Sequence, residues 1–462
     1  MSSSSSSLSS SLSDGGSISI GLLLVVVAGF LNGSWNVSFR PTHGYAVARR
    51  RGSTLPPAAP SNENANENNN LKEAEEDTTT TNPHDLEYHQ AWILFQVYAV
   101  LLNIPICLYW AGGPSQVATL IQASDGGDIF LVALFSLLWG AGSVGFGMAC
   151  QVAGVGLGTN LCMGVIMVLG TFLPLCLEGA IGTPAGALVV TGLVICCLGL
   201  ALAVTSLQVR DQEERGLSSS SSSSLQGQRS SQVTTSTATM CGEVPLSPIP
   251  GSTITATDVV PERTQAPSKD LQVASEKQDN NSSKNDNDYS TLYKVTVCVV
   301  AGIFAAQLQF AFVFGQDMID LAKADSDNVP SSGTSAVVWL FAFTLGAPAS
   351  IAYGVYNNPP EIPWSRLYRC PWYRHVLVLL TTSLPWITHI HLYGFSTTLL
   401  PDDLAASVAW PILMMMTVVT GILWSIVLGE WTHASQRSKT KLYQGLAAVT
   451  TGVIVIMASV SL

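Results

Sequence analysis

Charged residues are scarce in this sequence of 462 residues, because Asp, Glu, Lys and Arg together make up only 11% of it. An ordinary soluble domain carries roughly 25% charged residues. The charges that are present lie between long apolar runs, and no Asp or Glu lies in the middle of any run. A helix of about 20 apolar residues is long enough to cross the hydrocarbon core of a bilayer. The scarcity of charge therefore excludes an ordinary soluble domain and predicts an integral, multi-pass membrane protein.

Metal-binding and secretory patterns are also missing. The nine cysteines lie mostly within the apolar runs, and no C-x-x-C spacing occurs. Cysteines in apolar helices usually behave as small hydrophobic residues. The first sixteen residues are rich in serine but lack the basic stretch with which a cleaved signal peptide begins. We therefore expect no metal site, no disulfide, no cofactor and no signal peptide.

The apolar runs predict an all-α membrane protein with ten transmembrane helices. Each run is nearly free of charge and long enough to span a bilayer. The predicted spans are residues 18–39, 88–110, 128–152, 157–177, 184–206, 293–316, 334–356, 373–395, 405–429 and 440–460.

Three segments are too polar to cross a membrane or to form a core. Residues 1–17 are rich in serine, residues 40–87 contain an acidic, Asn-rich stretch, and residues 207–292 contain a run of serines with several prolines. Such compositions bury too little apolar surface to offset the conformational entropy of folding. We expect these segments to be disordered, with 207–292 as a cytoplasmic loop.

The basic residues predict the orientation. With ten spans, the loops that follow the odd-numbered spans hold 19 of the 20 Lys and Arg residues, and the opposite side holds only Lys323. Loops rich in Lys and Arg remain in the cytoplasm. Both termini are therefore predicted to be non-cytoplasmic.

Three sequence patterns recur in the same order and indicate an internal repeat, the last of them a carboxylate at the end of the fourth and ninth spans, Glu178 and Glu430. In the first and sixth spans, residues 27–29 and 300–302 both read Val-Ala-Gly, and the same register aligns Asn36 with Gln309. In the third and eighth spans, Trp139 and Trp386 are each followed at the same distance by an aromatic residue and a glycine.

Five spans per repeat is an odd number, so the two halves must cross the membrane in opposite orientations. The halves are residues 18–206, with the insert 40–87, and residues 293–462. Inverted repeats of this kind are typical of transporters that bind solute between the halves, near the middle of the bilayer.

Several of these stretches resemble one transporter family. Residues 138–142 (LWGAG) and 170–174 (GTFLP) are similar to the third and fourth helices of the L-rhamnose–proton symporter family, and Trp410-Pro411 and residues 429–431 (GEW) are similar to its ninth. That family belongs to the drug/metabolite transporter superfamily. The resemblance implies ten helices in a five-plus-five inverted arrangement and sugar uptake coupled to protons.

Three amides inside the spans are candidates for solute binding: Asn32, Asn36 and Gln309. A polar side chain within a span usually faces the bundle interior or a water-filled cavity. Asn32 and Asn36 are four residues apart and share a helix face, and amides both donate hydrogen bonds to sugar hydroxyls and accept them. The alternative is that these side chains join helices through hydrogen bonds.

Aromatic residues supply further candidates. Trp139 and Trp386 offer flat surfaces that pack against the apolar face of a pyranose ring, although plain packing is an alternative role. Trp386, His389 and Tyr393 share one face of the eighth span, whereas His391 points to the opposite side and is interpreted as structural or at the lipid boundary.

His389 is the candidate for carrying a coupled proton, because histidine titrates near neutral pH. A neutral histidine bonded to a neighbouring helix is the alternative. Glu178 and Glu430 lie at span ends, where a carboxylate is easily hydrated, so they are interpreted as structural or gate residues.

These observations predict a secondary active transporter of a sugar or similar small polar metabolite, coupled to protons and working by alternating access. The expected partners are the bilayer, the solute and protons, and no nucleic acid. Two alternatives stay open: an exchanger of nucleotide-sugars or phosphorylated metabolites, and a sensor or receptor. An enzyme is not expected, because no cluster of acid, base or metal ligands occurs in the spans.

Overall fold

The computed structural model describes residues 5–35, 88–232 and 291–462, except for Gly154, Pro359, Glu361, Asp402, Asp403, Glu430 and His433. The chain divides into two compact units, one formed by residues 1–213 and 291–462 and the other by residues 214–290. The first unit contains all the apolar stretches that are long enough to span a membrane.

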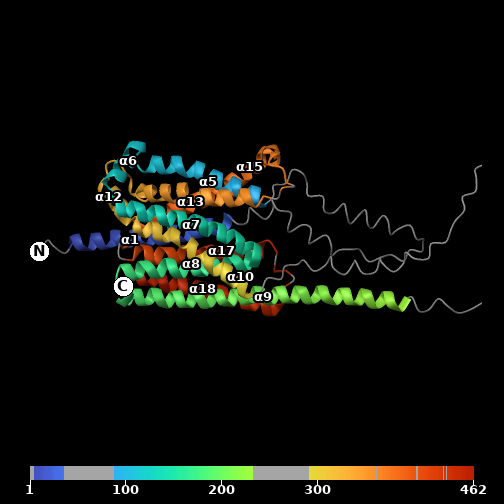
Figure 1. The fold of residues 1–462 in the computed structure, drawn as a ribbon. Helices are drawn as coiled ribbons and strands as arrows, with labels where there is room; N and C mark the ends of the chain where they lie inside the picture. Colours follow the sequence, from blue (N-terminus) through green and yellow to red (C-terminus); the bar gives the residue numbers. More distant parts are fainter. Residues whose placement is uncertain are drawn as a thin grey trace, which may run out of the picture. The chain divides into compact units, whose positions relative to one another are not determined.

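The described residues form helices and no strands (Figure 1). The first half contains α1 (Ser5–Ser34), α5 (Tyr88–Trp110), α6 (Pro114–Ala123), α7 (Gly126–Ala153), α8 (Val155–Leu177) and α9 (Pro184–Gln232). The second half contains α10 (Thr291–Ala305), α11 (Gln307–Phe314), α12 (Gln316–Ala324), α13 (Ala336–Tyr356), α14 (Ser365–Arg369), α15 (Trp372–Val378), η5 (Leu379–Ser383), α16 (Leu384–Thr397), α17 (Ala405–Val427) and α18 (Gln436–Ala458).

Ten stretches among the described residues are long and apolar enough to cross a membrane, which confirms the predicted number of spans. Two of these stretches are interrupted helices. The sixth span consists of α10, α11 and α12, and the eighth consists of α15, η5 and α16. Helix α1 begins at Ser5 and α9 ends at Gln232, so both helices continue beyond the apolar runs from which they were predicted. No proline after Pro184 interrupts α9.

Helices from the two halves pack directly against each other. Helix α1 packs on α16 and α17, and α10 packs on α7 and α8. In span numbers, the first span packs on the eighth and ninth, and the sixth span packs on the third and fourth. The two sets of neighbours correspond when each span of one half is paired with the equivalent span of the other half. Gly29 lies against Leu413 of α17, and its sequence counterpart Gly302 lies against Val165 of α8. An inverted repeat requires such paired neighbours; the repeat itself stays a prediction.

Glycines also allow α9 and α18 to approach closely. A Cβ atom on Gly192 would lie 2.7 Å from the carbonyl oxygen of Gly452, and a Cβ atom on Gly199 would lie 2.8 Å from that of Gly445. Between these two contacts, the Cys196 thiol donates to the carbonyl oxygen of Val449 at 3.7 Å. Small residues at a crossing let membrane helices reach backbone contact, where dispersion and weak polar contacts stabilise the pair.

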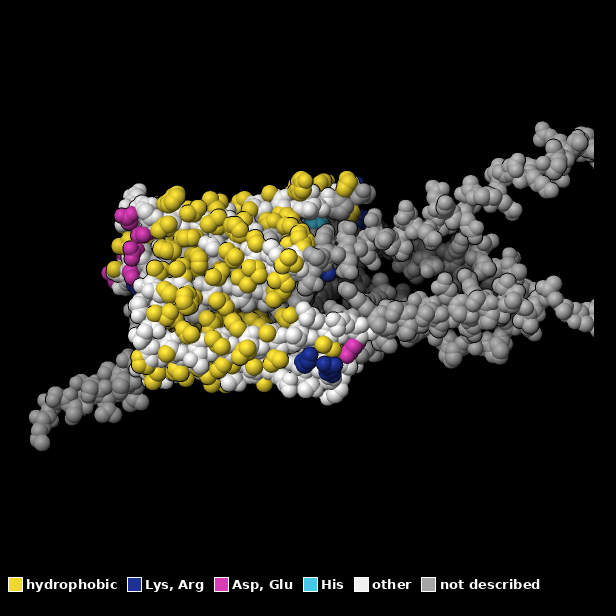
Figure 2. Space-filling view, turned by 60° about the horizontal axis from the view of Figure 1, so that its bottom comes forward, with side chains coloured by type: hydrophobic (Ala, Val, Ile, Leu, Met, Phe, Trp, Pro, Cys, Tyr) yellow, Lys and Arg dark blue, Asp and Glu magenta, His cyan; other side chains and the backbone are white. Residues whose placement is uncertain are grey.

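The surface of the bundle has the distribution expected for a bilayer. Figure 2 shows a broad band of hydrophobic side chains, with acidic side chains gathered at one end and Lys and Arg at the other. The acidic end is the one where α6 and α12 lie, and the C-terminus lies there as well (Figure 1). This separation of charge is the one on which the predicted orientation depends, with the basic end in the cytoplasm.

Candidate functional site

Buried aromatic rings meet where α5, α7, α13 and α16 come together. The rings of Trp139 and Trp386 stack with centroids 5.9 Å apart and planes 17° apart. Phe343 meets both rings edge-on, at 5.3 Å from Trp139 and 4.8 Å from Trp386. Phe95 also lies edge-on to Trp386, at 5.1 Å. The two tryptophans that the repeat pairs in sequence are therefore in contact, each held by phenylalanines from other helices.

The aromatic cluster continues to the end of α1. Trp35 stacks on Phe95 at 5.2 Å and lies 6.3 Å from Trp92. All of these rings are buried. Aromatic pairs in such geometries contribute about 0.5–1.5 kcal/mol each beyond the area that they bury. The cluster thus connects helices of both halves through flat apolar surfaces.

Beside the cluster, the sixth span is interrupted at Ala306, between α10 and α11. The regular bonding pattern changes there, and the backbone N–H of Gln309 donates to the carbonyl oxygen of Ala306 at 3.0 Å. The side-chain amide of Gln307 turns back and donates to the carbonyl oxygen of Ile303 at 2.8 Å. Ala306 itself keeps helical backbone angles, and its N–H still donates to the carbonyl oxygen of Gly302 at 2.9 Å, so the change is a local distortion of the helix.

Gln309 is fully buried just after this interruption, and its two amide atoms have different surroundings. Its Oε1 accepts a hydrogen bond from the Tyr393 hydroxyl at 2.8 Å. Its Nε2 donates to no atom of the residues that the structure describes. A buried donor without an acceptor costs about 1–3 kcal/mol, so native structures rarely leave one unmatched. Gln309 Nε2 is therefore a buried donor whose acceptor is not among the described residues.

Tyr393 is held on three sides by aromatic rings. It lies 5.2 Å from Phe312, 6.2 Å from Trp339 and 5.5 Å from Trp410. The structure thus brings together the predicted residues Gln309 and Tyr393. Trp139 contacts Trp386, which lies seven residues before Tyr393 on α16.

His389 lies between these two pairs on α16. Its ring is buried and is 6.1 Å from the ring of Trp386. Its Nδ1 has no hydrogen-bond partner among the described residues. The sequence predicts that His389, Trp386 and Tyr393 share one face of the helix. All three side chains are buried inside the helix bundle.

His391 faces a different set of neighbours. Its Nε2 lies 3.1 Å from Oδ1 of Asn103, and its ring meets Trp110 edge-on at 5.2 Å. Asn103 in turn donates to the carbonyl oxygen of Trp339 at 3.2 Å. The prediction of a structural role agrees with these bonds, but a place at the lipid boundary is wrong, because the side chain is buried between α5 and α13.

Asn32 takes part in an interhelical hydrogen bond. Its Nδ2 donates to the Thr417 hydroxyl at 3.0 Å, which joins α1 to α17. This is the alternative role that the sequence left open. Asn36 lies outside the described residues. The carboxylate of Glu178, at the exposed end of α8, accepts a hydrogen bond from Ser407 at 3.4 Å, and Glu430 also lies outside the described residues.

Several buried residues of α5 were not singled out from the sequence. Gln96 and Asn103 are both buried, as are Phe95 and Trp92 of the aromatic cluster. Gln96 and Asn103 are seven residues apart and so share a face of the helix. With Gln90, helix α5 contains three buried amides in a largely apolar span, which is the signal that identified Asn32, so the sequence contained the same information for α5.

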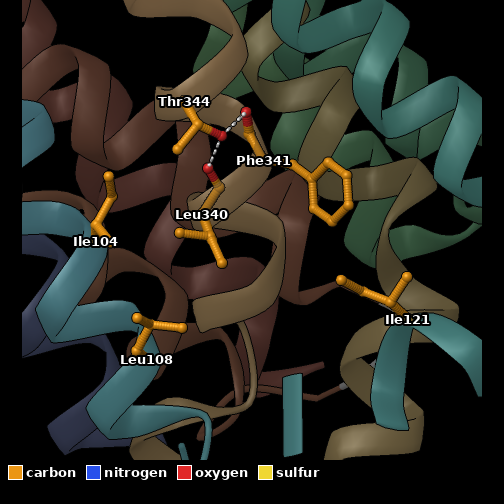
Figure 3. Close-up of a pocket in the computed structure, with 6 residues that line it drawn as sticks. All are labelled: Ile104, Leu108, Ile121, Leu340, Phe341 and Thr344. Carbon is orange, nitrogen blue, oxygen red and sulfur yellow. Dashed lines mark hydrogen bonds between the residues drawn. The ribbon is translucent and has the colours of Figure 1, made fainter. Parts of the chain in front are cut away.

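A cavity of about 300 Å³ opens elsewhere, between α5, α6 and α13. Figure 3 shows Ile104, Leu108, Ile121, Leu340, Phe341 and Thr344 around it. The single hydroxyl, on Thr344, donates within its own helix to the carbonyl oxygens of Leu340 and Phe341 at 2.5 and 3.3 Å. The lining is otherwise apolar, and none of the predicted site residues lies there.

Comparison with curated proteins finds L-rhamnose-proton symporters from Yersinia pestis (biovar Antiqua, strain Antiqua) and Yersinia pseudotuberculosis (serotype O:3, strain YPIII). Each is 28% identical to this chain over 94 residues, which is 20% of this chain. The matched part spans only 25% of the length of each symporter. No family model matches the chain. No solved structure matches it either.

Proposed function

We propose that this protein is a secondary active transporter of a neutral sugar or a similar small polar metabolite, coupled to protons and working by alternating access between two inverted five-helix halves. The observation that carries the proposal is Gln309. Its buried amide nitrogen lacks an acceptor among the described residues, lies next to an interrupted span, and belongs to a residue whose oxygen is already fixed by Tyr393. A solute hydroxyl would supply the missing acceptor.

The stacked tryptophans support a carbohydrate as the solute. A sugar ring presents C–H groups on one face and hydroxyls at its edge, so it matches a flat aromatic surface beside an amide donor. Trp139 and Trp386 provide that surface, and separation of the two halves would expose it. The similarity of one stretch of the chain to L-rhamnose-proton symporters agrees with this solute class.

The absence of buried charge supports a neutral solute. The buried polar side chains among the described residues are Asn, Gln, Ser, Thr and His, with no Lys or Arg. A phosphorylated metabolite or a nucleotide-sugar requires a cation to balance its phosphate, and Arg is the usual residue for this task. The buried core therefore favours a neutral solute over an anionic one.

Uptake into liposomes tests the proposal. We expect the purified full-length protein to accumulate at least one neutral monosaccharide, with L-rhamnose as the first candidate, when the outside is made more acidic than the lumen. A protonophore should abolish the accumulation, because it removes the gradient that drives it. A panel of neutral sugars that shows no uptake, with or without the gradient, would contradict the proposal.

Proton coupling is assigned to His389. We expect uptake by His389→Ala to lose its rise with falling external pH, because His389 is the proposed carrier of the coupled proton and its Nδ1 has no hydrogen-bond partner among the described residues. His391→Ala is the matched control, since it removes a second buried histidine from the same helix. That variant should keep the slope of the wild type. Equal changes of slope in the two variants would refute the assignment.

A further inference from the structure

Residues 364–374, which include α14 and the beginning of α15, expose four aromatic rings. Trp364, Tyr368, Trp372 and Tyr373 are all exposed, and Tyr368 and Trp372 retain 73% and 76% of their accessible surface. The segment is nevertheless fixed to the bundle, because Cys370 is buried and Leu367 packs against the core. The four rings are therefore held outward by a folded segment.

The same segment is strongly basic. Residues 362–401 contain three arginines, Arg366, Arg369 and Arg374, and no Asp, Glu or Lys. Arg369 is exposed, and Arg366 and Arg374 are partly exposed. The guanidinium of Arg374 lies over the ring of Tyr373, 5.6 Å from its centroid. Arginine presents a planar fork of donors that fits phosphate oxygens and stacks on aromatic rings.

The position of residues 364–374 in the bundle indicates that they lie at the level of the lipid head groups. Helix α15 lies at the end of the bundle opposite α6 and α12 (Figure 1), and this is the end where the hydrophobic band meets Lys and Arg side chains (Figure 2). Exposed Trp and Tyr side chains at such a boundary lie at the level of lipid head groups. The predicted orientation places this end in the cytoplasm, where the leaflet is rich in anionic lipid.

We propose that residues 364–374 form a binding site for the head group of an anionic phospholipid. The exposed aromatic rings lie among the lipid head groups, and the three arginines bind the lipid phosphate and any further acidic group. An acidic protein could also bind the three arginines, but its binding would not require exposed tryptophans at the edge of the hydrophobic band. The combination of rings and arginines therefore favours a lipid. The site is separate from Gln309 and does not depend on the proposed solute.

Thermal unfolding of the full-length protein in lipid nanodiscs tests the site. Nanodiscs of phosphatidylcholine alone are compared with nanodiscs containing phosphatidylserine, and the added anionic lipid should raise the melting temperature of the wild type. The variant Arg366→Gln/Arg369→Gln/Arg374→Gln should lose this increase, and phosphatidylserine should bind it at least about tenfold more weakly, since each arginine near an anionic surface contributes on the order of 1 kcal/mol.

The matched control is Arg437→Gln/Lys439→Gln/Lys441→Gln, which removes three charges from the beginning of α18, on the same predicted side. It should keep the increase. An equal loss in both triple variants would overturn the proposal, because the effect would then depend only on total charge. Soluble glycerophosphoserine and inorganic phosphate form a second arm, and stabilisation by either in phosphatidylcholine nanodiscs would overturn the lipid assignment in favour of a free anion.

A single substitution guards against misfolding of the triple variant. Arg369→Gln changes only an exposed side chain, so it should fold as the wild type does and lose part of the increase. Full retention of the increase by both Arg369→Gln and the folded triple variant would contradict the proposal.

Discussion

Uptake by the double variant Gln309→Leu/Tyr393→Phe is expected to fall about 10- to 100-fold while the protein stays folded. The change removes the amide that is proposed to donate to the solute, and a lost hydrogen bond to a buried partner costs about 1–3 kcal/mol. Leucine keeps most of the volume of glutamine. The measurement is initial uptake rate against solute concentration in liposomes, normalised to folded protein.

The second substitution makes the test specific. Gln309→Leu alone would leave the Tyr393 hydroxyl, which now donates to Gln309 at 2.8 Å, without an acceptor in a buried site. Replacement of both partners by apolar groups of similar shape is close to neutral for stability. Tyr393→Phe alone is the control, and it should lower uptake less than the double variant does. Wild-type uptake by a folded double variant would remove Gln309 from the proposed site.

The membrane architecture was predictable because the information lies in local composition. Each span needs only a continuous apolar run without charge, and the boundary charges set the orientation. The juxtaposition of Trp139 and Trp386 follows from a longer-range pattern, their equal spacing to an aromatic residue and a glycine in the two halves. The two rings stack 5.9 Å apart, and their proposed role in solute binding stays a prediction.

The sequence could not predict which neighbour each polar side chain bonds to, or where a helix is interrupted. The sequence left Asn32 with two possible roles, and only its bond to Thr417 decides for helix packing in this conformation. The interruption at Ala306 has no proline or glycine at its position, so no local signal marks it. The π-helical turn Leu379–Ser383 is different, because it ends two residues before Pro385, which has no N–H to continue the regular pattern.

In the eighth span, a π-helical turn lies next to a residue of the aromatic cluster. The π-helical turn lies just before Trp386, and the Ser383 hydroxyl within it donates to the carbonyl oxygen of Phe95 at 3.2 Å. Short π-helical stretches often mark functional positions in helices. A shift of this turn would move Trp386 relative to Trp139, which connects the geometry of the helix to the surface on which a solute would rest.

A large loss of stability is expected for Gly170→Val, because Gly170 of α8 lies against the indole ring of Trp410 of α17. A Cβ atom at this position would lie 2.6 Å from Cδ1 of the indole. The ring cannot move away easily, since its N–H donates to the carbonyl oxygen of Ile166 at 3.2 Å and its face packs against Tyr393 at 5.5 Å. Overpacking and loss of that hydrogen bond together cost about 3 kcal/mol or more.

This cost corresponds to a melting temperature about 10 °C lower in detergent, measured by the loss of monodisperse protein on heating. Gly421→Val in α17 is the matched control, because a Cβ atom there meets no other atom within 4 Å and the variant should melt near the wild type. Gly170→Val/Trp410→Phe should recover part of the loss, since the smaller ring vacates the space that the valine needs. Unchanged melting of Gly170→Val would show that α8 and α17 do not pack through this contact, and the arrangement of helices around Tyr393 and Gln309 would then be wrong.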